Sequence, residues 1–174
     1  MKKLLFILIF PFFIACSLED KIITIDNLYQ IEIPKGMTSM PGIMGNEDAS
    51  AQYGNVFSEK YLMVINESKS EWIDLLIEEN LNNKEYMSEY ISFLSESMED
   101  SFNSTHSLSD VYLNDSTPGK LFEIKGIIDG VDLIWNVIFV EGEDNLYQIA
   151  FWTSKGNEKK IVQLLSAAKT FKEL

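Results

Sequence analysis

The sequence predicts an α+β fold, in which a mostly antiparallel sheet has helices packed on one side. Three observations support this class. Residues 120–154 contain three consecutive apolar, alternating segments joined by short turns. Residues 68–98 interrupt the strands with two helical patterns, and the last strand is followed by an amphipathic helix. Helices grouped apart from runs of strands are typical of α+β proteins rather than of parallel α/β proteins.

The segment of residues 120–154 is the predicted scaffold of the sheet. Asp129-Gly130 separates two apolar runs by two residues, which is the strongest short-range signal for a β-hairpin. In the second run, Trp135 falls on one predicted face, and in the third run Trp152 shares a face with Gln148. Both faces of the second run carry apolar residues, so this strand is expected to be central and covered on both sides.

The other elements follow in order along the chain. Residues 22–25 and 29–33 are expected to form two strands around an Asp26-Asn27 turn, and residues 51–57 and 61–66 a hairpin. Ser68 and Glu71 match a capping box at the start of a helix. A second helix is expected to end near Met98, then a strand at residues 107–114, and Asn157 is expected to cap the last helix.

The N-terminus is expected to be an export signal. Lys2 and Lys3 precede an apolar run of about a dozen residues that ends at Ala15 and Cys16, and such a run is shorter than the roughly 20 residues of a spanning helix. Phe13-Ile14-Ala15-Cys16 resembles a bacterial lipobox, which implies cleavage before Cys16 and lipid attachment to it. The alternative is an uncleaved membrane anchor.

This interpretation divides the chain into a lipoprotein signal peptide (residues 1–15), a lipid-anchored tether (16–21) and a single domain (22–174). The location is then the cell envelope. Ser17, rather than Asp, follows the cysteine, which resembles an outer-membrane sorting signal more than an inner-membrane one. Glu19-Asp20 resembles the surface-export signals of some Gram-negative groups, so the side of the membrane stays open.

Composition excludes several classes of function. The formal net charge is −13, which disfavours binding to nucleic acid, because such binding requires a basic surface. Cys16 is the only cysteine and His106 the only histidine, which nearly excludes a tetrahedral zinc site and leaves no internal disulfide. No phosphate-binding loop or dinucleotide fingerprint is present, and we predict neither a cofactor nor a metal.

Five residues are candidates for partner binding. Met37, Met40 and Met44 lie in a glycine-rich loop, and methionine-rich loops can form adaptable binding surfaces. Trp135 and Trp152 would anchor a partner or stack on a sugar if their rings are exposed. For both sets the competing interpretation is packing in the core.

Two other functions compete with binding. An envelope hydrolase of glycans or esters would use His106 with Ser104, Ser107 or Asp110, or a pair of carboxylates. The candidate carboxylates are Glu123, Asp129, Asp132 and Glu141. An acidic inhibitor or immunity-type protein would show one continuous negative face.

The predicted domain resembles the PsbP-like family, which includes a photosystem extrinsic subunit, a nuclear-import release factor and many small bacterial lipoproteins. The matching segments are residues 29–36, 61–65, 126–130 and 147–150, the helices that follow residue 68, and the closing helix with Phe171. The resemblance implies an α/β sandwich, no shared catalytic residues, and a binding or assembly-helper role at a membrane. The expected function is therefore a lipid-anchored, non-enzymatic module that binds an unidentified protein partner or small ligand.

Overall fold

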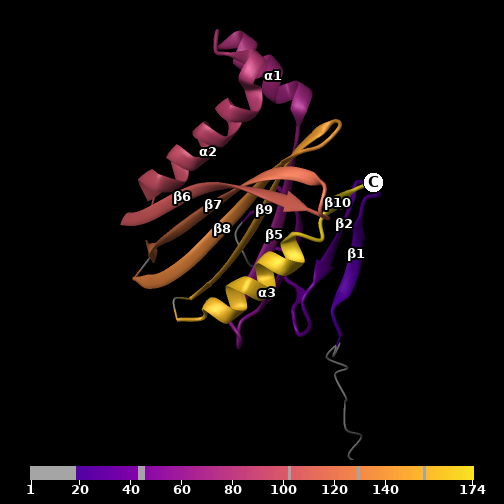
Figure 1. Ribbon diagram of the computed structural model, residues 1–174, viewed down its shortest axis with the longest axis vertical. Coiled ribbons are helices and arrows are strands. Elements are labelled where there is room, and N and C mark those ends of the chain that lie inside the picture. Colours follow the sequence, from indigo (N-terminus) through magenta and orange to yellow (C-terminus); the bar gives the residue numbers. More distant parts are fainter. Residues whose placement is uncertain (1–18, 43–45, 102, 129, 155) are drawn as a thin grey trace, which may run out of the picture.

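The computed structural model describes residues 19–42, 46–101, 103–128, 130–154 and 156–174 (Figure 1). Cys16, Met44 and Asp129, which carried sequence-based predictions, lie outside these ranges. The described chain is an α+β sandwich, so the predicted fold class is confirmed.

Seven antiparallel strands form the large sheet. In spatial order they are β3 (Thr38–Ser39), β4 (Ala49–Asn55), β5 (Lys60–Ser68), β9 (Asn145–Ser154), β8 (Val131–Glu141), β7 (Thr117–Ile128) and β6 (Asn103–Leu113). A second sheet contains β1 (Lys21–Ile25), β2 (Tyr29–Ile33) and β10 (Lys172–Glu173). Three α-helices and one 3-10 helix complete the described structure: α1 (Lys69–Glu78), η1 (Asn83–Glu85), α2 (Tyr86–Ser101) and α3 (Glu158–Ala168).

The predicted meander forms β7, β8 and β9. Ile128 pairs with Val131, which leaves a two-residue turn, and Gly130 has a φ of +80°. Glycine adopts this conformation without a steric penalty, as the hairpin signal required. The turn between β1 and β2 is also confirmed, because Asp26 and Asn27 both have positive φ angles there.

The helices are divided between the two faces of the large sheet, which corrects the expectation that they pack on one side. On one face, which we call the closed face, α3 and the three-stranded sheet cover the strands. On the other, which we call the helical-hairpin face, α1 and α2 cover part of the strands. The physical reason is that β5, β8 and β9 carry apolar side chains on both faces, and each face needs a cover.

An aromatic cluster fills the closed face. Tyr29 lies with its ring centroid 5.2 Å from that of Phe171 and 5.8 Å from that of Tyr147, while Tyr147 and Phe171 are 4.9 Å apart. All three side chains are fully buried. They join β2, β9 and the short segment between α3 and β10, so this cluster holds the small sheet and the helix onto the large sheet.

The helix ends show one confirmed and one corrected cap. Ser68 Oγ accepts a hydrogen bond of 3.3 Å from the backbone N–H of Glu71, as the capping box predicted. Asn157 makes no side-chain cap to α3; its amide instead donates to Ser154 and Glu59. Asn157 therefore links the β4–β5 turn to the end of β9 and does not cap the helix. Among the described helices, none is long and apolar enough to span a membrane.

Candidate binding surface

Three aromatic rings from adjacent strands stand side by side on the helical-hairpin face. Tyr61 on β5 is the register partner of Trp152 on β9, and Trp152 is the partner of Trp135 on β8. The ring centroids of Trp135 and Trp152 are 4.1 Å apart with planes at 13°, and those of Tyr61 and Trp152 are 5.3 Å apart with planes at 16°. We call these three residues the aromatic ladder. Each side chain is half-buried.

The stacking determines what the ladder can bind. Because β9 lies between β5 and β8, Trp152 has a ring on each side, and both of its faces are occupied. A sugar needs a free ring face to stack on, so Trp152 does not offer that mode of binding. The ladder instead presents a row of ring edges and apolar surface, which suits contact with the side chains of a protein partner.

The same row continues across the sheet toward the edge strand. Ile124 on β7 is the register partner of Trp135 and is fully buried. His106 on β6 is the partner of Ile124, and its ring lies 5.8 Å from that of Phe122. Leu108, two residues further along β6, is exposed. The ladder therefore forms the β5 end of a row that continues through Ile124 on β7 to His106 on β6.

A polar network fixes α2 beside this row. Tyr90 on α2 donates its hydroxyl hydrogen to the carboxylate of Glu67 on β5. Gln148 on β9 donates to Glu67 over 3.2 Å and to the Tyr90 hydroxyl over 3.0 Å. Burial, together with the hydrogen bond to Glu67, raises the pKa of Tyr90, so this tyrosine stays a neutral donor. The network fixes the position of the helix that borders the ladder.

A pocket of about 470 Å³ opens next to this network, between β5 and the helices α1 and α2. Trp72 and Tyr90 provide its aromatic wall, with ring centroids 5.4 Å apart. Three carboxylates, those of Asp48, Glu67 and Glu71, lie around it. The pocket is open on one side and acidic, in keeping with the charge of the whole chain.

The two described methionines of the predicted binding loop, Met37 and Met40, face the protein interior. Met37 and Met40 are each 8% exposed, and Met37 packs within the core of the closed face. Met40 is also hydrogen-bonded to β4, since its backbone N–H donates to the backbone oxygen of Gln52 over 2.9 Å. The structure thus places Trp135 and Trp152 together on one surface and places Met37 and Met40 away from it.

Among the described side chains, the candidates for a hydrolase site do not gather in one place. His106 and Ser107 are neighbours on one strand, so their side chains point to opposite faces of the sheet. Asp110 forms an ion pair of 2.5 Å with Lys120. Glu141, a candidate carboxylate, accepts hydrogen bonds from Tyr86 and Lys69 and so ties the β8–β9 turn to the helices. Among the described residues, no group of three His, Cys, Asp or Glu side chains could hold a metal ion.

A buried lysine lies at the opposite end of the sheet from α1. Lys60 is 8% exposed, and its ammonium donates to the backbone oxygen of Lys35 over 3.3 Å. Burial lowers the pKa of Lys60, with nearby Asp20 acting in the opposite direction. Lys60 and Asp20 line a pocket of about 320 Å³, which is bordered by Gln163, Ser166 and Ala167 in the second half of α3.

Sequence reasoning missed Tyr61 and Lys60. Residues 61–65 alternate, which places Tyr61 and Met63 on the same face of a strand, and this pattern was the available sequence signal for the position of Tyr61. Which strand lies beside β5, and in which register, is decided by long-range pairing that the alternation does not encode. Lys60 was assigned to a turn, but it opens β5.

Comparisons with known proteins support the fold. The chain has the fold of cyanobacterial PsbP (CyanoP) from Synechocystis sp. PCC 6803, with a TM-score of 0.59, 8% identity, and coverage of 90% of this chain and 93% of that protein. A protein of Bacteroides thetaiotaomicron matches with a TM-score of 0.54 and 10% identity, over 90% of this chain and 49% of its own length. No family model and no curated protein sequence matches. The domain is therefore an α+β sandwich of the PsbP-like class, and at these identities the likeness shows the fold alone.

Proposed function

We propose that this protein is a lipid-anchored cell-envelope protein, attached through Cys16, that acts without catalysis and binds a protein partner through the aromatic ladder. The observation that carries this proposal is the ladder itself. Three large aromatic side chains stay partly exposed on one face of the sheet, whereas Tyr147 and Phe151 on its other face are fully buried. Aromatic residues are enriched at the centres of protein interfaces, where they provide large contact areas with few rotatable bonds.

The surroundings of the ladder favour a protein over a glycan or a substrate. Both faces of Trp152 are occupied by its neighbours, which argues against stacking on a sugar ring. His106 and Ser107 point to opposite faces of the sheet, so these two residues do not form a nucleophile and base pair. What remains is an aromatic and apolar row bordered by a fixed helix, which resembles the centre of an interface.

The location rests on the first 20 residues. The apolar run up to Ala15 and the following Cys16 support lipid attachment, and Ser17 supports the outer membrane over the inner one. The PsbP-like fold agrees with an assembly-helper role, since the resemblance implies a binding function at a membrane. The acidic charge disfavours nucleic acid as the partner.

Site-specific photo-crosslinking in the intact cell envelope tests this proposal. A photoreactive phenylalanine replaces Tyr61, which keeps an aromatic ring in the ladder. The matched control carries the same residue at Tyr112, an exposed tyrosine on the edge strand β6. We expect one covalent protein adduct from position 61 and none of the same mass from position 112. We also expect Trp152→Ala in the position-61 chain to abolish the adduct. Equal adducts at both positions, or an adduct that survives Trp152→Ala, would contradict the proposal.

A further inference from the structure

The hairpin between β4 and β5 ends in two exposed apolar side chains. Phe57 is fully exposed and Val56 is 60% exposed. Turns of this kind usually carry Gly, Asn, Asp, Pro or Ser, because those residues fit turn geometry and water. A phenylalanine whose side chain is fully exposed at such a turn therefore indicates a contact with something outside the chain.

The hairpin keeps its shape without using these two side chains. Asn55 Oδ1 accepts a hydrogen bond of 2.9 Å from the backbone N–H of Ser58, and the backbone N–H of Glu59 donates to Val56 over 3.3 Å. The carboxylate of Glu59 accepts from Ser154 and, over 3.4 Å, from Asn157. Polar contacts thus brace the turn from both sides, while the two apolar side chains project outward.

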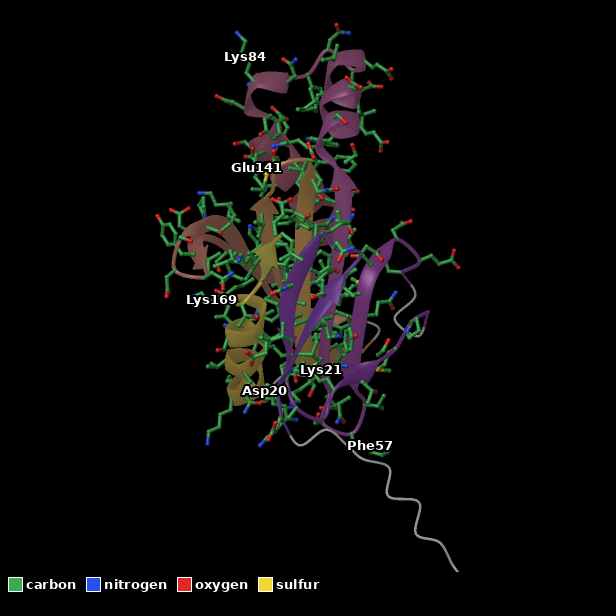
Figure 2. The ribbon with its side chains drawn as sticks, turned by 90° about the vertical axis from the view of Figure 1, so that its right-hand side faces the viewer. Asp20, Lys21, Phe57, Lys84, Glu141 and Lys169 are labelled. Atoms are coloured by element: carbon green, nitrogen blue, oxygen red, sulfur yellow. The ribbon has the colours of Figure 1, made fainter. Side chains whose placement is uncertain are left out.

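The same hairpin lies next to the point where the tether enters the domain. The backbone N–H of Lys35 donates to Asp20 over 2.7 Å, and Asn55 Nδ2 donates to the oxygen of Gly36 over 2.5 Å. One short loop therefore connects the end of the tether with the base of the hairpin. Figure 2 shows Asp20, Lys21 and Phe57 at one end of the molecule and Lys84 at the opposite end.

The tether is too short to move this end far from a lipid attached to Cys16. Asp20 lies four steps along the chain from Cys16, and a fully extended chain covers at most about 14 Å over that number of steps. We infer that Val56 and Phe57 insert into the phospholipid surface that carries the lipid on Cys16, as a second contact that orients the domain on the membrane. This inference rests on the lipid anchoring proposed above.

The charge at this end is compatible with a lipid surface. Among the described residues, five lysines lie around the tether and the hairpin: Lys21, Lys35, Lys60, Lys159 and Lys160. They offset the nearby carboxylates of Glu19, Asp20, Glu32, Glu59 and Glu158. The chain as a whole carries a net charge of −13, so this end meets headgroup phosphates with less repulsion than the rest of the surface would.

Depth-sensitive fluorescence on the full lipidated protein tests the inference. Cys16 is the only cysteine, and lipid blocks its sulfur, so Phe57→Cys introduces one thiol for an environment-sensitive dye. The control is Leu81→Cys, an equally simple change at a 54% exposed apolar residue next to η1. Both proteins are reconstituted into phosphatidylethanolamine–phosphatidylglycerol vesicles, with and without nitroxide-labelled acyl chains.

We expect a blue-shifted emission and at least a twofold loss of intensity with nitroxide lipid for the dye at position 57. The dye at position 81 is expected to change by less than a tenth. A lipidated chain that floats with the vesicles but shows equal, weak quenching at both positions overturns the insertion and leaves the anchor intact. A chain that carries no lipid on Cys16 by mass spectrometry and stays off the vesicles overturns both the anchor and the insertion.

Discussion

The two faces of the large sheet use aromatic residues in different ways. On the closed face, Tyr29, Tyr147 and Phe171 pack at varied angles and exclude water completely. On the helical-hairpin face, Tyr61, Trp152 and Trp135 stack nearly in parallel and stay half-exposed. The closed face has a second sheet and a helix as its cover, whereas α1 and α2 cover the other face only in part, and the ladder stays partly exposed there.

This difference indicates a division of tasks within one sheet. A completely buried aromatic side chain contributes its full apolar area to folding, while a half-exposed one keeps part of that area for a partner. Truncation of a closed-face residue should therefore unfold the domain, and truncation of a ladder residue should impair binding more than folding. The predictions below test this contrast, from the largest effect to the smallest.

The largest effect is expected for Phe171→Ala. Phe171 is 1% exposed and contacts both tyrosines of its cluster, so its loss leaves a cavity between the two sheets and α3. We expect the free energy of unfolding to fall by about 3–5 kcal/mol. Urea denaturation followed by fluorescence measures the change. Phe93→Ala, at an exposed site on α2, is the control and should cost less than about 1 kcal/mol. Similar losses in the two variants would contradict the assignment of the closed face as the main core.

The second effect concerns pH. Burial raises the pKa of Tyr29 from 10.0 to about 12, with the hydrogen bond between Tyr29 and Ser50 as a smaller, opposing influence. Because the folded state holds this proton more tightly than the unfolded state, the stabilisation is complete below pH 10. It is lost as the pH rises from about 10 to about 12.

In this window the wild type should lose about 1.4 kcal/mol per pH unit more than Tyr29→Phe does. Urea midpoints at pH 8, 10, 11 and 12 measure the two slopes, and Tyr112→Phe on the exposed edge strand is the control. Parallel curves for the wild type and Tyr29→Phe would show that the closed face does not shield Tyr29.

A smaller effect on folding is expected for Trp152→Ala. The change removes two stacking contacts, each worth about 0.5–1.5 kcal/mol beyond the buried area, from a side chain that is only half-buried. We expect a loss of about 1–3 kcal/mol in urea denaturation, less than for Phe171→Ala. A loss as large as that of Phe171→Ala would mean that the ladder is a part of the core.

The smallest effect is expected for Ser68→Ala. Ser68 caps α1 through Glu71, and loss of such a cap costs about 1 kcal/mol. Hydrogen exchange should then show faster exchange in the first turn of α1, while amides of β9 keep their protection. Faster exchange throughout β9 would show that the helical hairpin and the sheet unfold together, and that the two covers are not independent.

The sequence predicted what local patterns encode. Alternation and the Asp129-Gly130 signal predicted β7, β8 and β9 together with the faces of Trp135 and Trp152, because side-chain direction follows from the period of a strand. The cap at Ser68 was predicted for the same reason, since the capping box lies within four residues.

Long-range features escaped prediction. The strand predicted from residue 107 begins earlier in the structure, because β6 starts at Asn103. Its first residues are polar and pair with β7, so no apolar pattern marks them in the sequence. The division of helices between the two faces depends on how much apolar surface each face leaves open, which a linear pattern does not reveal. Tyr61 joined the ladder only through the pairing of β5 with β9, strands separated by about 80 residues.

The most direct test of the account is to measure partner capture and stability in the same ladder variant. Trp152→Ala, carrying the photoreactive residue at position 61, is compared with the Trp152-containing chain in the intact envelope and in urea denaturation. The account predicts that the adduct disappears while the domain keeps a cooperative unfolding transition shifted by no more than about 3 kcal/mol. An adduct that persists in a folded Trp152→Ala protein would show that the partner binds elsewhere, and would contradict the assignment of the helical-hairpin face to recognition.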